Sequence, residues 1–408
     1  MEFDYIICGG GSAGCVLAAR LSEDPAVTVC LIEAGGMGRD IFIRAPALVA
    51  AMVSGRPPIH NWALHTTPQP GLNGRRGFQP RGKALGGSSA INAMLYVRGH
   101  PSDYDVWADL GATGWDWASV LPYFLKFEGN ARPGPLHGSD GPLQVGDQRF
   151  PRPISRAFVQ AMGDVQVPEN PDFNGAVQEG AGLYQVTQFH SGPRKGERCS
   201  AAAAYLHPVL TRPNLTVLTR TRAEKITFDG QRATGVIVKR GLTRRALTAR
   251  HEVIVAQGTF GSPQLLMLSG IGPADHLRAH GLPVIHDLPG VGQNLQDHLD
   301  YTISHHSLRR DTVGLNPRGL MRLAKAGLHW RKTGEGLFAS PMARVGPSSA
   351  PPPISRAPIC KFTSWWVLSI NTCAACIWPT AFPRMSACCG PSRGALSRCT
   401  RPTPAMRP

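Results

Sequence analysis

Three glycines near the amino terminus, with a fixed spacing, are the residues of this chain that most directly indicate a chemical function. Gly9, Gly11 and Gly14 form a GxGxxG pattern directly after a short apolar run. An acid, Glu33, follows the last glycine by about 20 residues, the spacing expected of a carboxylate that hydrogen-bonds ribose hydroxyls. Glycines and acid together predict a site for a dinucleotide, with a purely structural glycine turn as the alternative.

Each glycine of the pattern has its own task. Gly9 makes the tight turn after a strand, Gly11 lets the backbone approach a pyrophosphate, and Gly14 lets the following helix pack closely on the strand. The start of that helix, with Ser12 and Ala13, supplies free N–H groups and the positive end of a dipole for the phosphates.

The elements that position these residues can be predicted from the surrounding sequence. Residues 4–8 and 27–32 are short apolar runs, which favours buried strands of a parallel sheet, and residues 13–21 between them predict a helix. A second strand, turn and helix unit is predicted from a strand at 246–255, a glycine-containing turn and a helix at 263–268.

Two further segments complete the predicted sheet. Residues 215–218 are strand-like. Between residues 228 and 239, Asp229 and Gly230 separate two β-rich runs and predict a hairpin that extends the nucleotide-binding part. The alternation of strands and helices predicts an α/β fold.

A second glycine-rich stretch lies at residues 82–92, where two glycines and two serines follow one another. Loops of this composition expose backbone N–H groups that bind anions, although a plain surface turn would have the same composition. This stretch and its continuation to Gly99 resemble the glucose-methanol-choline (GMC) oxidoreductases. In those flavoproteins this loop surrounds the pyrophosphate and its continuation lies along the flavin.

A third segment makes the resemblance specific. Residues 258–272 are similar to the second sequence signature of the GMC family over their whole length. Shorter family-like stretches lie at 122–124, 137–145, 200–208 and 290–298. The resemblance covers about residues 2–300 and extends more loosely to about 343.

The resemblance implies a fold of two parts. The first is an FAD-binding Rossmann-like domain made of residues 1–150 and 200–300. The second is a partial substrate domain on an antiparallel sheet, made of residues 151–199 and 301–343. Residues 344–408 form a tail without family character.

The resemblance also implies FAD as the cofactor. Members with covalent flavin attach it through a histidine just before the asparagine of the loop, and here that position is Ile91, so non-covalent FAD is expected. The residues expected to bind FAD are Gly9, Gly11, Ser12, Ala13, Gly14, Glu33, Ala34, Gly82, Leu85, Gly87, Ser88, Asn92, Ala93, Met94, Leu95 and Ala223.

The family's chemistry is the oxidation of an alcohol. A hydride passes from the CH–OH carbon to flavin N5 while a histidine, paired with a second histidine or an asparagine, receives the hydroxyl proton. Choline or a primary alcohol is the substrate class implied, and the absence of covalent flavin favours a dehydrogenase with an acceptor such as a quinone over an oxidase.

The residues of that catalytic pair cannot be assigned in this chain. The family places the pair in its C-terminal third, but the last histidine in this sequence is His329. His298, His305 and His306 could act as a base, although neighbouring histidines more often lie at a solvated strand edge. Two hypotheses therefore stay open, an FAD-dependent alcohol dehydrogenase and a flavin-binding protein that is catalytically incomplete.

Net charge and cysteine placement limit other function classes. The net charge is +16, but residues 344–408 contain eight basic and no acidic residues, so half of the excess lies there. The rest is spread without a basic stripe, which argues against nucleic-acid binding. The sequence starts without a signal-peptide pattern, so a cytoplasmic location is expected, with peripheral attachment to the inner membrane as an alternative. Cys8, Cys15 and Cys30 are expected to be buried and reduced.

The tail after residue 343 has an unusual composition. It contains eleven prolines, six of the ten cysteines, three tryptophans and no histidine. A GC-rich gene read in a shifted frame would yield this composition, and a disordered tail is a second interpretation. A zinc site at Cys373 and Cys376 and a membrane anchor over residues 362–383 are weaker alternatives, because only one CxxC pair is present and polar residues dilute the apolar run. No metal is expected.

Overall fold

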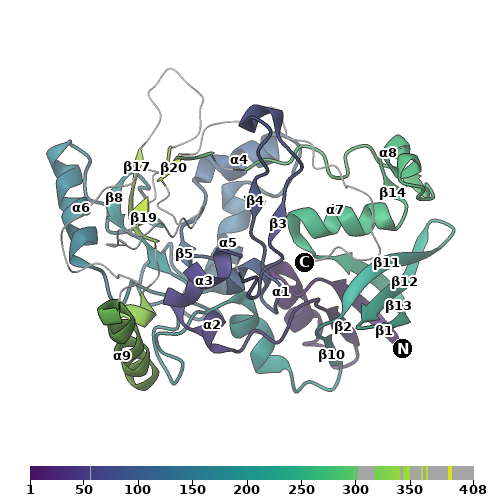
Figure 1. Ribbon diagram of the computed structural model, residues 1–408, viewed down its shortest axis with the longest axis horizontal. Coiled ribbons are helices and arrows are strands. Elements are labelled where there is room, and N and C mark those ends of the chain that lie inside the picture. The colour runs from purple at the N-terminus through teal and green to yellow at the C-terminus, as the bar shows by residue number, and fades with distance from the viewer. Residues whose placement is uncertain are drawn as a thin grey trace.

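A computed structural model gives the fold of this chain. It describes residues 1–55, 57–297 and 317–340, and in addition the backbone of the strands at residues 299–301, 343–349, 360–361, 364–365 and 385–387. Figure 1 shows a large sheet at one end of the longest axis and a smaller one at the other end.

The large sheet has six strands in the order β10-β2-β1-β13-β12-β11. Its members are β1 (Glu2–Cys8), β2 (Val29–Ile32), β10 (Leu215–Leu218), β11 (Arg222–Asp229), β12 (Arg232–Arg240) and β13 (Thr243–Val255). β10, β2, β1 and the second half of β13 are parallel, whereas β11, β12 and the first half of β13 are antiparallel. The predicted α/β fold is therefore confirmed.

Burial explains why the short apolar runs form the centre of this sheet. All four residues of β2 are buried, and so are Ile6, Ile7 and Cys8 of β1. One face packs on α1 (Ser12–Leu21) and on η4 (Ala202–Leu206), and the other packs on α7 (Gly258–Leu268), with side chains of β11 and β12 in the same core cluster. A strand covered on both faces has no polar positions, as expected of a parallel sheet.

Several elements differ in extent from their sequence-based predictions. β2 begins at Val29 rather than residue 27, and β13 begins at Thr243 rather than residue 246. α7 begins at Gly258, so the prediction of a turn before a helix at 263–268 was wrong at its start. The hydroxyl of Ser262 accepts the N–H of Gln257 at 3.1 Å and so gives a partner to the backbone N–H just before the helix. The hairpin at Asp229 and Gly230 is confirmed.

The chain leaves the large sheet after β2 and returns at β10. The helical elements on this excursion are α2 (Ile41–Arg44), η1 (Pro46–Leu48), α3 (Val49–Val53), η2 (Pro70–Leu72), η3 (Gly87–Ala90), α4 (Pro101–Asp109), α5 (Trp117–Phe127), α6 (Pro153–Asp164), η4 and η5 (His207–Val209). The strands are β3 (Leu64–His65), β4 (Phe78–Gln79), β5 (Leu95–Tyr96), β6 (Glu128–Asn130), β7 (Leu143–Val145), β8 (Gly180–Leu183) and β9 (Gln185–Val186).

The remaining elements follow α7. They are β14 (Ile271–Gly272), α8 (Ala274–Ala279), β15 (His286–Asp287), β16 (Leu299–Tyr301), α9 (Pro317–Thr333), η6 (Leu337–Ala339), β17 (Ala343–Ser349), β18 (Cys360–Lys361), β19 (Ser364–Trp365) and β20 (Met385–Ala387). β17 pairs antiparallel with β8, β18 and β19, next to α6 at the far end of the molecule (Figure 1).

This second sheet is antiparallel, the type expected for the substrate part, and β17 continues past residue 344. The domain boundaries themselves stay a prediction. Apart from the strands β18, β19 and β20, the rest of the predicted tail, including Cys373, Cys376 and most of the apolar run 362–383, lies outside the described residues.

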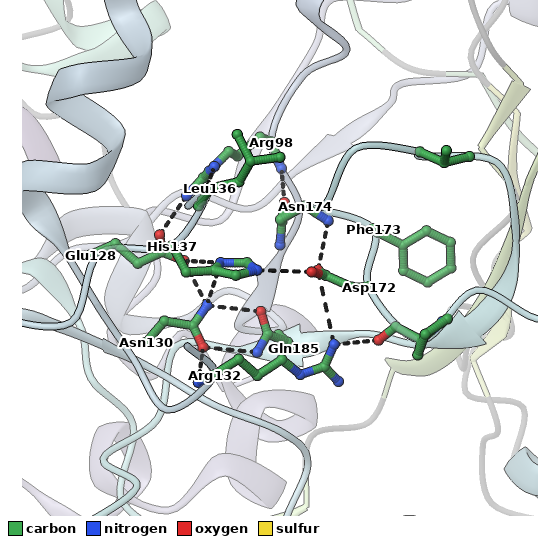
Figure 2. A network of polar contacts seen from close by, with 12 residues as sticks. Arg98, Glu128, Asn130, Arg132, Leu136, His137, Asp172, Phe173, Asn174 and Gln185 are labelled. Carbon is green, nitrogen blue, oxygen red and sulfur yellow. Dashed lines mark hydrogen bonds and ion pairs between the residues drawn. The ribbon is translucent and has the colours of Figure 1, made fainter. Parts of the chain in front are cut away.

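A buried network of polar side chains stabilises the excursion, the segment between β2 and β10. The carboxylate of Glu128 pairs with the guanidinium of Arg98 and accepts a hydrogen bond from Asn130 at 2.7 Å, and all three residues are buried. Figure 2 shows the ring of His137 between Glu128 and Asp172, with ring nitrogens 3.3 and 2.8 Å from their carboxylate oxygens. The network joins the segment after α5 to the segment before β8.

We predict that Arg98→Met lowers the free energy of unfolding by about 3–5 kcal/mol, because it leaves the carboxylate of Glu128 buried without its cation. Urea denaturation measures the change. Arg278→Met removes one partner of the exposed pair Arg278–Asp275 and should change stability little. Equal effects of the two substitutions would contradict the role assigned to the buried pair.

Candidate cofactor-binding site

The carboxyl ends of three parallel strands meet at one edge of the large sheet. Cys8 at the end of β1 pairs with Ile32 at the end of β2 and with Val255 at the end of β13. The glycine turn, Glu33 and the start of α7 follow these strand ends directly. This edge is where α/β sheets bind their ligands.

Two of the fingerprint glycines are required by the protein itself. Gly9 has a φ of +110°, and a Cβ there would lie 2.5 Å from the carbonyl oxygen of Ala256. A Cβ on Gly14 would lie 1.9 Å from the oxygen of Gly9, so only glycine lets α1 approach β1 this closely. These are the roles predicted from the sequence.

Gly11 differs from its neighbours, because little of the protein surrounds it. Its φ is −74°, and the nearest atom to an added Cβ would be the oxygen of Ala256 at 3.9 Å. Ser12 and Ala13 follow as exposed residues in the first turn of α1. The space over Gly11 and the N–H groups of this first helical turn form an open surface, called the cradle below, of the kind that helix N-termini offer to anions.

The second glycine-rich loop forms the other side of this cradle. The N–H of Gly86 donates to the oxygen of Gly10 at 2.8 Å. A Cβ on Gly87, whose φ is +52°, would lie 2.7 Å from the Cα of Gly11, and a Cβ on Gly82 would lie 2.0 Å from the oxygen of Gly87. The two loops can touch only because these positions are glycine.

The residues after Gly87 differ in exposure. Ser88 and Asn92 are exposed, whereas Met94 is buried and has a φ of +63°. Ala93 is half-buried, and Leu95 begins β5. Ser88 and Asn92 therefore present polar groups beside the cradle.

Glu33 lies next to the glycine turn. Its carboxylate accepts hydrogen bonds from the backbone of this turn and from the loop that follows β2. One oxygen accepts the N–H of Gly10 at 2.9 Å and the other accepts the N–H of Gly35 at 2.7 Å. The side chain is only 7% exposed, and burial raises its pKa, while the two backbone hydrogen bonds and the charge of Lys83 act in the opposite direction. Each carboxylate oxygen can still accept one further hydrogen bond.

The other predicted site residues lie nearby or in the core. Ala34 is half-buried between Glu33 and Gly35, and Leu85 is fully buried with its N–H donating to Gly36 at 2.9 Å. Ala223 is different, because its side chain packs in the core of the large sheet. Cofactor binding by Ala223 stays a prediction that only its backbone could fulfil.

The segment 258–272 adjoins the same site. The guanidinium of Arg81 lies 4.8 Å from the ring centre of Phe260 and so joins the second loop to α7. A cavity of about 360 Å³ lies between α7 and residues 291–296. Its volume is in the range of small-molecule sites.

Sequence reasoning missed one residue of this region, Arg198. It lies just before the family-like stretch 200–208, and its guanidinium donates to the backbone and side-chain oxygens of Asn92 at 2.7 and 2.8 Å. Nothing in the local sequence separates this arginine from a surface one, because its partners are more than one hundred positions away.

Other predictions concern groups outside the cradle. His298, His305 and His306 lie outside the described residues. Cys8, Cys15 and Cys30 are free and buried as expected, and burial raises the pKa of each thiol to about 12. Within the described part of the chain, no cluster of side chains suits a metal ion and no helix is long and apolar enough to cross a bilayer.

The strand order, the glycine turn and the buried acid are those of the α/β fold class typical of dinucleotide-binding proteins. A sequence model of the family described as GMC oxidoreductase matches residues 3–300. The chain belongs to this family, which uses FAD, and the resemblance deduced from its motifs is confirmed.

Known relatives support the same assignment. The chain is 46% identical over 329 residues to "Alcohol dehydrogenase [acceptor]" of Pseudomonas putida, covering 79% of this chain and 58% of that protein. It is 46% identical over 352 residues to "Choline dehydrogenase, mitochondrial" of Homo sapiens, covering 83% and 57%. The chain thus spans little more than half the length of these relatives.

A solved structure shows the same fold. It is an FAD-dependent oxidoreductase from Chaetomium thermophilum, 32% identical, with a TM-score of 0.76 over 85% of this chain and 62% of the other. The α/β architecture is therefore shared with a protein whose sequence has diverged considerably.

The contrast between Gly11 and Gly14 gives a prediction that separates fold from cofactor binding. Gly11→Ala should change the free energy of unfolding of the cofactor-free protein by less than about 1 kcal/mol, because its Cβ meets no close atom. It should weaken FAD binding at least about tenfold, because the methyl group enters the cradle.

Gly14→Ala is the matched substitution. It should destabilise the protein with or without FAD by about 1–3 kcal/mol or more, because its Cβ overlaps the backbone of Gly9. Thermal unfolding and fluorescence titration with FAD measure the two effects. An unchanged FAD affinity in Gly11→Ala would contradict the prediction that FAD binds over Gly11.

Proposed function

We propose that this chain binds FAD non-covalently in the cradle between its two glycine-rich loops and serves the oxidation of the CH–OH group of an alcohol. The observation that carries the proposal is the open surface over Gly11, which is bordered by the first turn of α1 and by Gly87. No protein atom requires glycine at Gly11, so a ligand that must come close to the backbone accounts for it.

The residues of the cradle have distinct tasks in this proposal. The N–H groups at the start of α1 bind the pyrophosphate, and the free acceptor positions of Glu33 receive ribose hydroxyls. Ser88 and Asn92 face the cofactor from the second loop. FAD, when bound, accepts the hydride of the alcohol at flavin N5.

Non-covalent binding is supported by the position before Asn92. Ile91 is 3% exposed and packs with Ile43, Met52, Ala84 and Ala90 in a small core. It offers no nucleophile and points into the protein. FAD should therefore leave the protein on denaturation without a covalent link.

The substrate class rests on the relatives. Two of them carry the names of an alcohol dehydrogenase and a choline dehydrogenase, so choline or a primary alcohol is the proposed substrate, and a quinone or another acceptor is the proposed electron sink.

A second candidate is a flavin-binding protein that does not turn over. It is favoured by one observation, the absence of any histidine after His329 in this sequence. An alcohol oxidation needs a base for the hydroxyl proton.

The deciding experiment combines an absorption spectrum with anaerobic reduction. Under the first proposal, the purified protein shows an oxidised flavin band that trichloroacetic acid releases into the supernatant, and choline or a primary alcohol bleaches this band without oxygen. A bound flavin that dithionite bleaches and no alcohol does would establish the second candidate. Absence of flavin, even after incubation with FAD, would contradict both proposals.

A further inference from the structure

One buried cation stands directly behind the second glycine-rich loop. Arg198 is 1% exposed and is one of the largest fully buried side chains. Among the described residues, no carboxylate lies within ion-pair distance of its guanidinium. The other deeply buried arginine of the excursion, Arg98, has Glu128 as its counter-ion.

Arg198 instead binds neutral oxygens from two segments. Its Nε donates to the carbonyl oxygen of Ile43 at 3.0 Å, and its Nη1 donates to the carbonyl oxygen of Asn92 at 2.7 Å. The backbone N–H of Arg198 also donates to Arg44 at 2.9 Å. The guanidinium therefore fixes the end of the second loop against the segment that contains α2.

The same guanidinium fixes the orientation of the Asn92 amide. Nη1 of Arg198 and the N–H of Met94 both donate to Oδ1 of Asn92, at 2.8 and 3.1 Å. Two donors on one side require the oxygen there, so the Nδ2 group must point the other way. Asn92 is exposed, and its Nδ2 group is thus a donor on the open side of the loop.

This arrangement is costly for a purely structural contact. Burial lowers the pKa of Arg198 to about 9, and its Nη2 group is buried with no hydrogen-bond partner among the described residues. A buried cation without a carboxylate is destabilising unless something else requires it. Buried charges of this kind are concentrated at functional sites.

We propose that Arg198 is a positioning residue for the cofactor: it holds Oδ1 of Asn92 inward so that Nδ2 is offered as a donor, and it places a positive charge behind the loop. The inference rests on the proposed binding of FAD. It explains why the side chain of Asn92 is held in one orientation and why the residue that holds it, Arg198, is charged.

Two substitutions of Arg198 separate geometry from charge. Arg198→Met should weaken FAD binding about tenfold to a hundredfold and lower the midpoint potential of the bound flavin, since a cation that favours the reduced, more negative form is lost. Arg198→Lys keeps the charge but cannot reach both segments, so its potential should stay near that of the wild type while its FAD affinity falls. Fluorescence titration and dye-coupled reduction measure these quantities.

Asn92→Asp tests the orientation of the amide independently. The new carboxylate pairs with Arg198, so the cofactor-free protein should unfold at the same or a higher temperature. The outward donor becomes an acceptor, and FAD affinity should fall about tenfold. This variant keeps the inference testable if Arg198→Met fails to fold.

Arg44→Met is the matched control. Arg44 is half exposed, and its partner Glu197 keeps Arg194 at 3.1 Å after the substitution. FAD affinity and potential should stay within about twofold of the wild type, because its side chain does not contact the loop.

The outcomes separate this inference from the function on which it rests. Failure of the wild type to bind FAD would overturn the proposed function and this inference with it. Wild-type FAD binding with unchanged affinity and potential in folded Arg198→Met, or with unchanged affinity in Asn92→Asp, would overturn this inference alone.

Discussion

The contact between two stretches of bare backbone is the constraint on which the rest of the structure depends. The N–H of Gly86 donates to the oxygen of Gly10, and Gly87 lies so close to the Cα of Gly11 that no side chain fits at Gly87. The first loop belongs to the large sheet and the second to the long excursion. This approach is one of the contacts that join the long excursion to the large sheet, and it borders the open surface over Gly11.

Buried polar groups hold this contact in place together with apolar packing, since Leu85 of the second loop lies in the core with Ile7 and Leu31. Glu33 ties the glycine turn to Gly35 from below, and Arg198 ties the far end of the second loop to the segment of α2. Both are buried charges whose pKa values are shifted toward the neutral form by burial. The stability of the fold and the readiness of the cradle thus depend on the same two side chains.

Local sequence was enough to predict the parts of the fold that local physics determines. The short apolar runs of β1 and β10, the glycine turn and the hairpin at Asp229 and Gly230 depend on neighbours within a few residues. The start of α7 was missed because the glycines at 258 and 261 suggested a turn, whereas the chain is helical from Gly258. The role of Arg198 was missed because it depends on Asn92, which is remote in sequence. Glu33 was found by its spacing, but its bonds to two loop amides were not.

The position of β1 in the large sheet has a consequence for synthesis of the protein. β1 is the first strand made, yet it lies between β2 and β13, and its last residue, Cys8, pairs with Val255. At about 5–20 residues per second, roughly 12 to 50 s pass before β13 leaves the ribosome. Until then one edge of β1 has no partner, and an apolar strand with a free edge invites association with other chains. A nascent chain with this strand order therefore exposes an unpaired edge of β1 until Val255 has been made.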